Sequence, residues 1–199
     1  MNRSGIIRRP RTEAAKSPAS DERELLARVA AGDLQAFERL YRLYQPRLSR
    51  FLTTLLRRPQ LIEEVLDDTM MVVWQSADRF RGSSKLSTWI FAIAYRKAHK
   101  ARLKWPDPIE EPEQDTRLSE DPAPDDELHH QKLHDSLMRA MDQLSADHRA
   151  VVELTYFHGL GYREIAEIVD CPVDTVKTRM FHARRRLKQA IGGRLSDWF

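Results

Sequence analysis

The sequence predicts an all-α protein with two small helical domains, a flexible, acidic, proline-rich linker between them, and a C-terminal helix-turn-helix. Two observations predict this fold. Apolar residues recur at helical spacing along most of the chain, and no run alternates with period two for long enough to be a strand. One short segment, residues 105–127, differs in composition from both of its flanks. The 199 residues suffice for two small domains.

The divisions of the chain follow from charge and proline content. Residues 105–127 hold ten acidic residues, one basic residue and five of the ten prolines. Such a segment buries too little apolar surface to offset its ordering entropy, so we expect a linker. Residues 1–20 hold five basic residues and one acidic residue, and we expect a disordered basic tail. This leaves one domain at 21–104 and a second at 128–195.

Three helices are expected in the first domain. Asp33 can cap the first, in which Pro46 should cause a kink or a division. Pro59 suits the first turn of the second. Ser87 or Thr88 can cap the third, which becomes basic towards its end. The expected apolar faces are, in order, Leu34, Phe37, Leu40, Tyr41 and Tyr44, continued after Pro46 by Leu48, Phe51, Leu52, Leu55 and Leu56; Leu61, Ile62, Val65, Leu66, Thr69, Val72 and Val73; and Trp89, Ile90, Ile93 and Ala94.

The second domain is predicted to consist of short helices, the last two of which form a helix-turn-helix. Ser145 can cap a helix that Gly159 or Gly161 ends. The run YREIAEIV, the break DCP and the run VDTVKTRMFHARRRLKQAI then predict two helices with a tight turn between them. The residues expected to be buried are Leu133, Leu137, Met138, Met141 and Leu144; Val151, Val152, Leu154 and Tyr156 or Phe157; and Ile165, Ala166 and Val169 packed against Val176, Met180 and Leu187.

The last predicted helix has the chemistry of a DNA-reading element. Residues 173–190 hold six Lys or Arg side chains and one acid, Asp174. Small polar groups and donors near the start of such a helix can read base edges in the major groove, whereas the later arginines suit phosphates. We therefore expect DNA binding.

Several classes of function have little support. The lone cysteine, Cys171, excludes an internal disulfide framework and fits a reducing compartment. No run is long and apolar enough for a membrane helix, and no phosphate loop or catalytic constellation suggests an enzyme or a cofactor. His130 and His134 have the spacing of a metal pair, with His129 nearby, but no third ligand follows, so we expect solvated side chains and no metal.

Five segments resemble one family. GDLQAFERLYRLYQPRL, IEEVLDDTMMVVW, RFRGSSKLSTWIFAIAYRKAHKARLK, LSADHR and YREIAEIVDCPVDTVKTRMFHARRRLK are similar, in this order, to conserved regions of the extracytoplasmic function (ECF) sigma factors of the bacterial sigma-70 family. The resemblance favours a polymerase specificity subunit over the two alternatives, a stand-alone helix-turn-helix regulator and a partner-sequestering module. It implies a cytoplasmic protein that binds core RNA polymerase and promoter DNA, without membrane insertion, and serves a stress or envelope response. It also implies an anti-sigma factor as partner.

The resemblance assigns roles to residues. His182, Asp67 and Arg96 depart from the Arg, Gln and Asn that are frequent at these family positions. The implied polymerase-binding residues are Leu66, Asp67, Asp68, Met71 and Trp74. The implied contacts to the single-stranded minus-10 box are Arg81, Gly82, Ser83, Ser84, Lys85, Ser87, Thr88, Trp89, Arg96, Lys97 and Lys100. The implied contacts to the duplex minus-35 box are Thr175, Lys177, Thr178, Arg179, Phe181, His182, Arg184 and Arg185.

Overall fold

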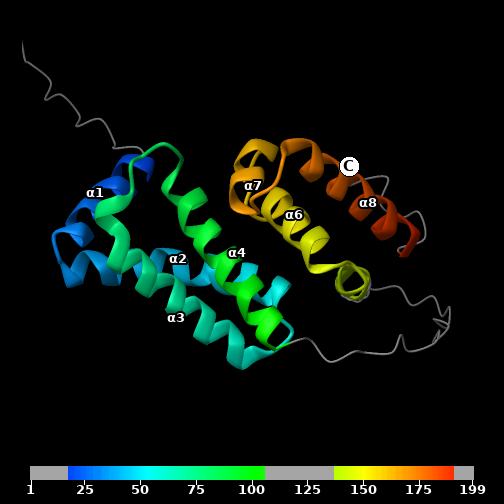
Figure 1. Ribbon diagram of the computed structural model, residues 1–199, viewed down its shortest axis with the longest axis horizontal. Helices are drawn as coiled ribbons and strands as arrows, with labels where there is room; N and C mark the ends of the chain where they lie inside the picture. The colour runs from blue at the N-terminus through cyan, green and yellow to red at the C-terminus, as the bar shows by residue number, and fades with distance from the viewer. Residues whose placement is uncertain (1–17, 106–136, 191–199) are drawn as a thin grey trace, which may run out of the picture.

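The computed structural model describes residues 18–105 and 137–190, and all regular secondary structure in these residues is helical (Figure 1). The all-α prediction is therefore confirmed. Residues 137–142 are also helical. The named elements are α1 (Pro18–Ala30), α2 (Leu34–Leu55), α3 (Pro59–Ser76), the 3₁₀ helix η1 (Ala77–Arg79), α4 (Leu86–Lys104), α6 (Ala146–Tyr156), α7 (Tyr162–Ile168) and α8 (Val173–Ala190).

Helix α2 is the centre of the first domain. It buries an unbroken stripe that includes Leu40, Tyr44, Leu48 and Phe51, and it packs against α1, α3 and α4. Pro46 lies inside α2, on its exposed side, so the expectation that this proline could divide the helix is wrong. Burial on both sides of the proline outweighs the loss of one backbone hydrogen bond.

The first residues of the helices in the first domain agree in part with the predictions from the sequence. Asp33 caps α2 as predicted, since its Oδ1 accepts from the backbone N–H groups of Gln35 at 2.9 Å and Ala36 at 3.0 Å. Leu34, expected in the core, is exposed because it opens the helix on the solvent side. Helix α4 begins at Leu86, so neither Ser87 nor Thr88 is its cap.

Helix α1 was missed by the sequence analysis. It begins at Pro18, inside the segment that we assigned to the basic tail, and it buries Leu26 and Val29 against the rest of the domain. The remainder of the predicted tail, and the predicted linker after Trp105, lie outside the described residues.

The second domain contains the predicted helix-turn-helix. Ile165, Ala166 and Val169 are buried in one core with Val176, Met180 and Leu187, as expected. Ser145 caps α6 by accepting from the backbone N–H of His148. The burial of Met138 and of Tyr156 or Phe157 was predicted wrongly, since all three are exposed.

Those two aromatic side chains make surface contacts instead. The Tyr156 hydroxyl accepts from Nε of Arg184 at 2.9 Å, and the guanidinium of Arg50 lies 3.8 Å from the centre of the Phe157 ring. Such contacts favour an aromatic ring at a partly solvated surface.

The two domains lie against each other. Helix α6 packs on α2 and α7 packs on α4, while α8 packs on α6 and α7 and lies on the outer side of the molecule (Figure 1). This arrangement, which we call the closed conformation, leaves the outer face of α8 uncovered by the first domain.

Candidate nucleic-acid interface and docking face

Helix α8, which the sequence predicts to be the recognition helix, is held in one rotational setting by its buried side. Val176, Met180, Ala183 and Leu187 are buried at positions separated by three or four residues. The opposite side must therefore face solvent. Of the predicted minus-35 residues, two are half-buried, Thr175 and Arg179, and six are exposed: Lys177, Thr178, Phe181, His182, Arg184 and Arg185.

Arg179 differs from the other predicted minus-35 residues because its own domain already binds it. Its guanidinium donates to Oδ2 of Asp147 at 2.7 Å and lies 3.8 Å from Sγ of Cys171. The hydroxyl of Tyr95, on α4, donates to the other oxygen of Asp147 at 3.1 Å. Burial, and then the Asp147 charge, raise the pKa of Tyr95 to about 12, so this hydroxyl remains a donor at neutral pH. Asp147 thus joins the recognition helix to the first domain.

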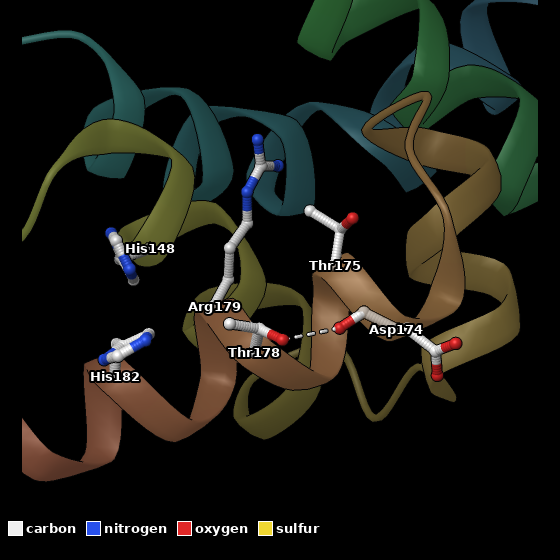
Figure 2. A pocket seen from close by; sticks show the side chains of 6 residues that line it. All are labelled: His148, Asp174, Thr175, Thr178, Arg179 and His182. Carbon is white, nitrogen blue, oxygen red and sulfur yellow. Dashed lines mark hydrogen bonds between the residues drawn. The ribbon is translucent and has the colours of Figure 1, made fainter.

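An open cleft of about 400 Å³ lies between the first turn of α6 and one side of α8. Figure 2 shows His148, from α6, facing His182, from α8, across this cleft, while Arg179 extends away from them. The two imidazole rings are 6.4 Å apart, centre to centre, and nearly perpendicular. The sequence analysis assigned no role to His148, because nothing local in the chain shows that α6 begins beside α8.

The predicted minus-10 segment is divided between exposed and covered residues. Ser87 and Thr88 are buried, and Trp89 is half-buried against Phe80, with 5.3 Å between ring centres. Lys85 forms an ion pair with Glu164 of α7, at 2.8 Å. Ser84 and Lys97 are half-buried, and the exposed members are Arg81, Gly82, Ser83, Lys85, Arg96 and Lys100.

The predicted docking helix α3 exposes three of its five candidate residues, Asp67, Asp68 and Met71. Each carboxylate already has a partner, since Tyr41 donates to Asp67 at 2.9 Å and Lys97 pairs with Asp68 at 2.9 Å.

The other two candidates on α3 lie beneath this face. Trp74 is half-buried and packs edge-on against Phe37, at 5.1 Å between ring centres. Leu66 is only 4% exposed, so it supports the face from beneath and does not present a contact surface.

Charged groups are buried where α2 meets α6. The Glu153 side chain is 4% exposed and accepts from Nε of Arg50 at 2.9 Å. Burial raises the pKa of Glu153, and Arg50 opposes that rise. Arg149, also buried, donates to the backbone carbonyl of Thr54 at 2.7 Å and to that of Leu144 at 3.0 Å. The domain interface therefore depends on particular hydrogen bonds as well as on apolar area.

His158 is a second titratable side chain that is buried in this interface. Its side chain is 4% exposed and its ring lies 4.6 Å from that of Phe91 and 6.2 Å from that of Phe51. Burial, then the charges of Arg47 and Arg50, lower the pKa of His158 to about 4. The imidazole is therefore neutral at pH 7, and its 3.8 Å approach to Glu153 is not an ion pair.

Metal-binding clusters and membrane-spanning helices are assessed for the described residues only. Within residues 18–105 and 137–190, no three His, Cys, Asp or Glu side chains are grouped so as to hold a metal ion. No helix in the same ranges has the length and apolar character needed to cross a membrane. His129, His130 and His134 lie outside the described residues.

Comparison with known proteins decides between the functional classes. Residues 40–104 match sigma-70 region 2, and residues 134–187 match sigma-70 region 4. The ECF RNA polymerase sigma-E factor of Haemophilus influenzae is 31% identical over 85% of this chain and 95% of its own length. The chain belongs to the ECF group of the sigma-70 family. It is a sigma factor that directs transcription initiation, and the stand-alone regulator is not favoured.

Other relatives of this sigma factor support the same family assignment. The sigma-E factor of Escherichia coli is 30% identical over 84% of this chain and 92% of its own. Among solved structures, sigma factor RpoE of Bartonella quintana, in complex with the anti-sigma factor NepR, is 26% identical, with a TM-score of 0.56 over 80% of this chain and 98% of its own. CnrH in complex with the cytosolic domain of CnrY, at 21% identity and a TM-score of 0.62 over 86% of this chain and 97% of its own, shares the fold.

Proposed function

We propose that this sigma factor acts in the cytoplasm through three surfaces. The exposed side of α3 contacts core polymerase, the loop before α4 captures the single-stranded minus-10 box, and the outer face of α8 reads the duplex minus-35 box. Support for the third surface is geometric: the side of α8 opposite its buried stripe carries exposed polar, aromatic and basic side chains, the set that reads base edges and contacts phosphates.

One observation carries the proposal further: in the closed conformation the other domain holds Lys85, one of the proposed minus-10 residues, whereas the outer face of α8 is exposed. Ser87 and Thr88 are buried, and Lys85 is paired with Glu164 of the other domain. The outer face of α8 has no such cover. Capture of an unstacked base requires a reachable pocket, so we propose that the domains separate before the minus-10 box is captured.

Run-off transcription with core polymerase tests the overall proposal. The template is a pool of upstream DNA fragments that includes the fragment preceding the protein's own gene. We expect transcripts that appear only when the protein is added. No transcript, combined with tight sequence-specific binding of duplex DNA by the protein alone, contradicts the proposed role.

The substitution Met71→Glu tests the docking face. Met71 is 52% exposed, so the change adds a charge to a surface without disturbing the core. We expect a loss of polymerase binding in a pull-down with purified core enzyme. Leu34→Glu, at another exposed apolar position on the same domain, is the matched control and should bind normally. Equal binding by both variants contradicts the assignment of α3.

Glu164→Gln tests the covering of the minus-10 surface. Glutamine retains an oxygen that can accept from the backbone N–H of Gly161, as Glu164 does at 3.1 Å, but it loses the charge that holds Lys85. Because Lys85 is mostly exposed, the ion pair is worth at most about 1 kcal/mol. We expect a few-fold more transcript at limiting polymerase. Glu167→Gln, on the exposed side of α7, is the control. Identical yields from the two variants contradict the proposed separation.

We also propose an anti-sigma partner for this chain. The RpoE structure from Bartonella quintana is a complex with such a factor. A protein that holds the two domains together or covers α3 is expected to abolish run-off transcription when added before core polymerase. It should have little effect when it is added after the polymerase complex has formed.

A further inference from the structure

The cleft between α6 and α8 contains two histidines, one on the predicted reading face and one outside it. His182 is exposed on α8, among the predicted minus-35 residues, whereas His148 is half-buried on the first turn of α6. Their rings face each other at 6.4 Å, and Thr178 and Arg179 also line the cleft (Figure 2). DNA seated on α8 would therefore meet His148 at the edge of the same surface.

Ser145 orients His148 and leaves one ring nitrogen for a ligand. The serine Oγ lies 2.5 Å from Nδ1 of His148 and also accepts from the backbone N–H of that residue. The hydroxyl can donate its proton to Nδ1 while its oxygen serves as the helix cap. In that arrangement the imidazole carries its proton on Nε2, and the side chain can donate towards an acceptor in the cleft.

The charges around His148 are mostly positive. Arg179, His182 and Arg186 approach it from α8, and Asp147 is its acidic neighbour on α6. Burial, followed by the charges of Arg186, Arg179 and His182, lowers the pKa of His148. The uncharged form is thus favoured in the protein alone. A nearby anion would reverse this preference, because an opposite charge favours the protonated imidazole.

We propose that His148 and His182 together form a contact site for the phosphate backbone of the minus-35 DNA, and that binding is accompanied by proton uptake. This inference rests on the proposed reading of the minus-35 box by α8. DNA phosphate is the ligand that fits, since Arg179 and Arg186 beside His148 repel a cation, while the acidic neighbour Asp147 is paired with Arg179 and Asp174, which also lines the cleft, is paired with Lys177. Two imidazoles without a third His, Cys, Asp or Glu among the described residues make a poor metal site.

The sign of the pH dependence of DNA binding follows from the protonation of His148 in the free protein and in the DNA complex. The protein alone binds fewer protons at His148 than the complex does, so affinity for DNA rises as pH falls through the range between the two pKa values. One proton taken up changes the dissociation constant by at most about tenfold per pH unit. A residue that only supported the fold would not produce this dependence.

Fluorescence anisotropy with the full chain tests the inference. The probe is a short labelled duplex enriched from a random pool by the wild-type protein at pH 8. Titrations at pH 8.0, 7.0 and 6.0 compare the wild type with His148→Gln, which keeps a hydrogen-bonding side chain that does not titrate. His99→Gln, at an exposed position on α4, is the matched control. We expect wild type and control to bind more tightly, by about threefold or more, as pH falls to 6.0, and His148→Gln to lose much of this gain.

The outcomes separate this inference from the proposed function. An unchanged pH dependence in His148→Gln, in a protein whose specific binding is lost on Phe181→Ala, overturns the inference and leaves the reading by α8 intact. Absence of any preferred duplex for the wild type overturns both. Circular dichroism of His148→Gln should match the wild type, and His182→Gln repeats the test at an exposed position if it does not.

Discussion

At the residue scale, Arg149 shows how one buried side chain holds several segments together. Its guanidinium donates to carbonyl oxygens in α2 and in the turn before α6, and to that of Asp142 at 3.4 Å. A neutral apolar side chain would leave these buried acceptors without donors. Leaving such groups unpaired costs more than the hydrogen bonds contribute when formed.

Arg149→Met is therefore expected to lower the free energy of unfolding by about 2–4 kcal/mol. Urea denaturation followed by circular dichroism measures this change. Arg163→Met, at an exposed position on α7, is the control and should shift the free energy of unfolding by less than about 0.5 kcal/mol. A loss below about 1 kcal/mol for Arg149→Met would mean that water or other side chains replace its bonds.

His182 is the second residue for which we predict the effect of a substitution. An arginine at this exposed position on α8 would present five donors in a fixed fork, and it would be charged at every pH used. His182→Arg should strengthen minus-35 binding or change the preferred sequence, as measured by repeating the selection from a random duplex pool. The same affinity and the same selected sequence would show that this position does not contact DNA.

At the element scale, helical periodicity predicted most of the fold. The repeat of apolar residues located α2, α3, α4 and α6 and both helices of the helix-turn-helix, because each buries one continuous stripe. Helix α1 was missed because its short apolar face, at Leu26 and Val29, lies in a sequence rich in charge. Its stability comes from packing on α2, which no local pattern reveals.

The sequence located the candidate sites less completely than the elements. The resemblance assigned α3, the loop before α4 and α8, and the structure divides these residues into exposed and buried sets. Leu66 belongs to the buried set because helical residues one turn apart share a face with the core. The pairing of His148 with His182 was beyond prediction, since it depends on how α6 crosses α8.

Pro46 gives a prediction that concerns α2 as an element. Proline inside a helix removes one backbone donor and crowds the preceding turn, and alanine is about 3 kcal/mol more favourable in a helix interior. Pro46→Ala is expected to raise the free energy of unfolding by about 1–3 kcal/mol in thermal denaturation. No gain, or a loss, would indicate that the proline shapes α2 for its contacts at Arg47 and Arg50 with the rest of the molecule.

At the scale of the whole molecule, the domain interface joins the two proposed DNA-binding surfaces. Arg50 pairs with Glu153, Tyr95 with Asp147, and Lys85 with Glu164, each across the boundary between the domains. Removing Arg50 would leave the buried Glu153 carboxylate without its cation. The interface is thus specific, and a few side chains determine whether it forms.

His158 makes the interface sensitive to acid. Its pKa is about 4 in the closed conformation and near 6.5 when exposed, so the closed form binds fewer protons than the separated form. The neutral ring is compatible with the interface above pH 6.5, and closure weakens as pH falls from 6.5 towards 4. One pH unit in this range is worth at most about 1.4 kcal/mol.

We therefore expect the radius of gyration, measured by small-angle X-ray scattering, to increase between pH 7.5 and 5.5. His158→Phe, which keeps an aromatic ring against Phe51 and Phe91, should remain compact over the same range. Glu153, Arg47 and Arg50 face this site in both proteins, so the difference between them isolates His158. A variant that expands as the wild type does would assign the effect to another group.

The stability of the closed interface also determines what fraction of the protein is in the separated form at equilibrium. If only the separated form captures the minus-10 box, every 1.4 kcal/mol of interface stability lowers the competent population about tenfold. The apparent affinity for the minus-10 box falls by the same factor, although no residue proposed to contact DNA has changed. Substitutions at Arg50, Glu164 or His158 would then adjust the threshold concentration of this sigma factor without altering the promoters that it recognises.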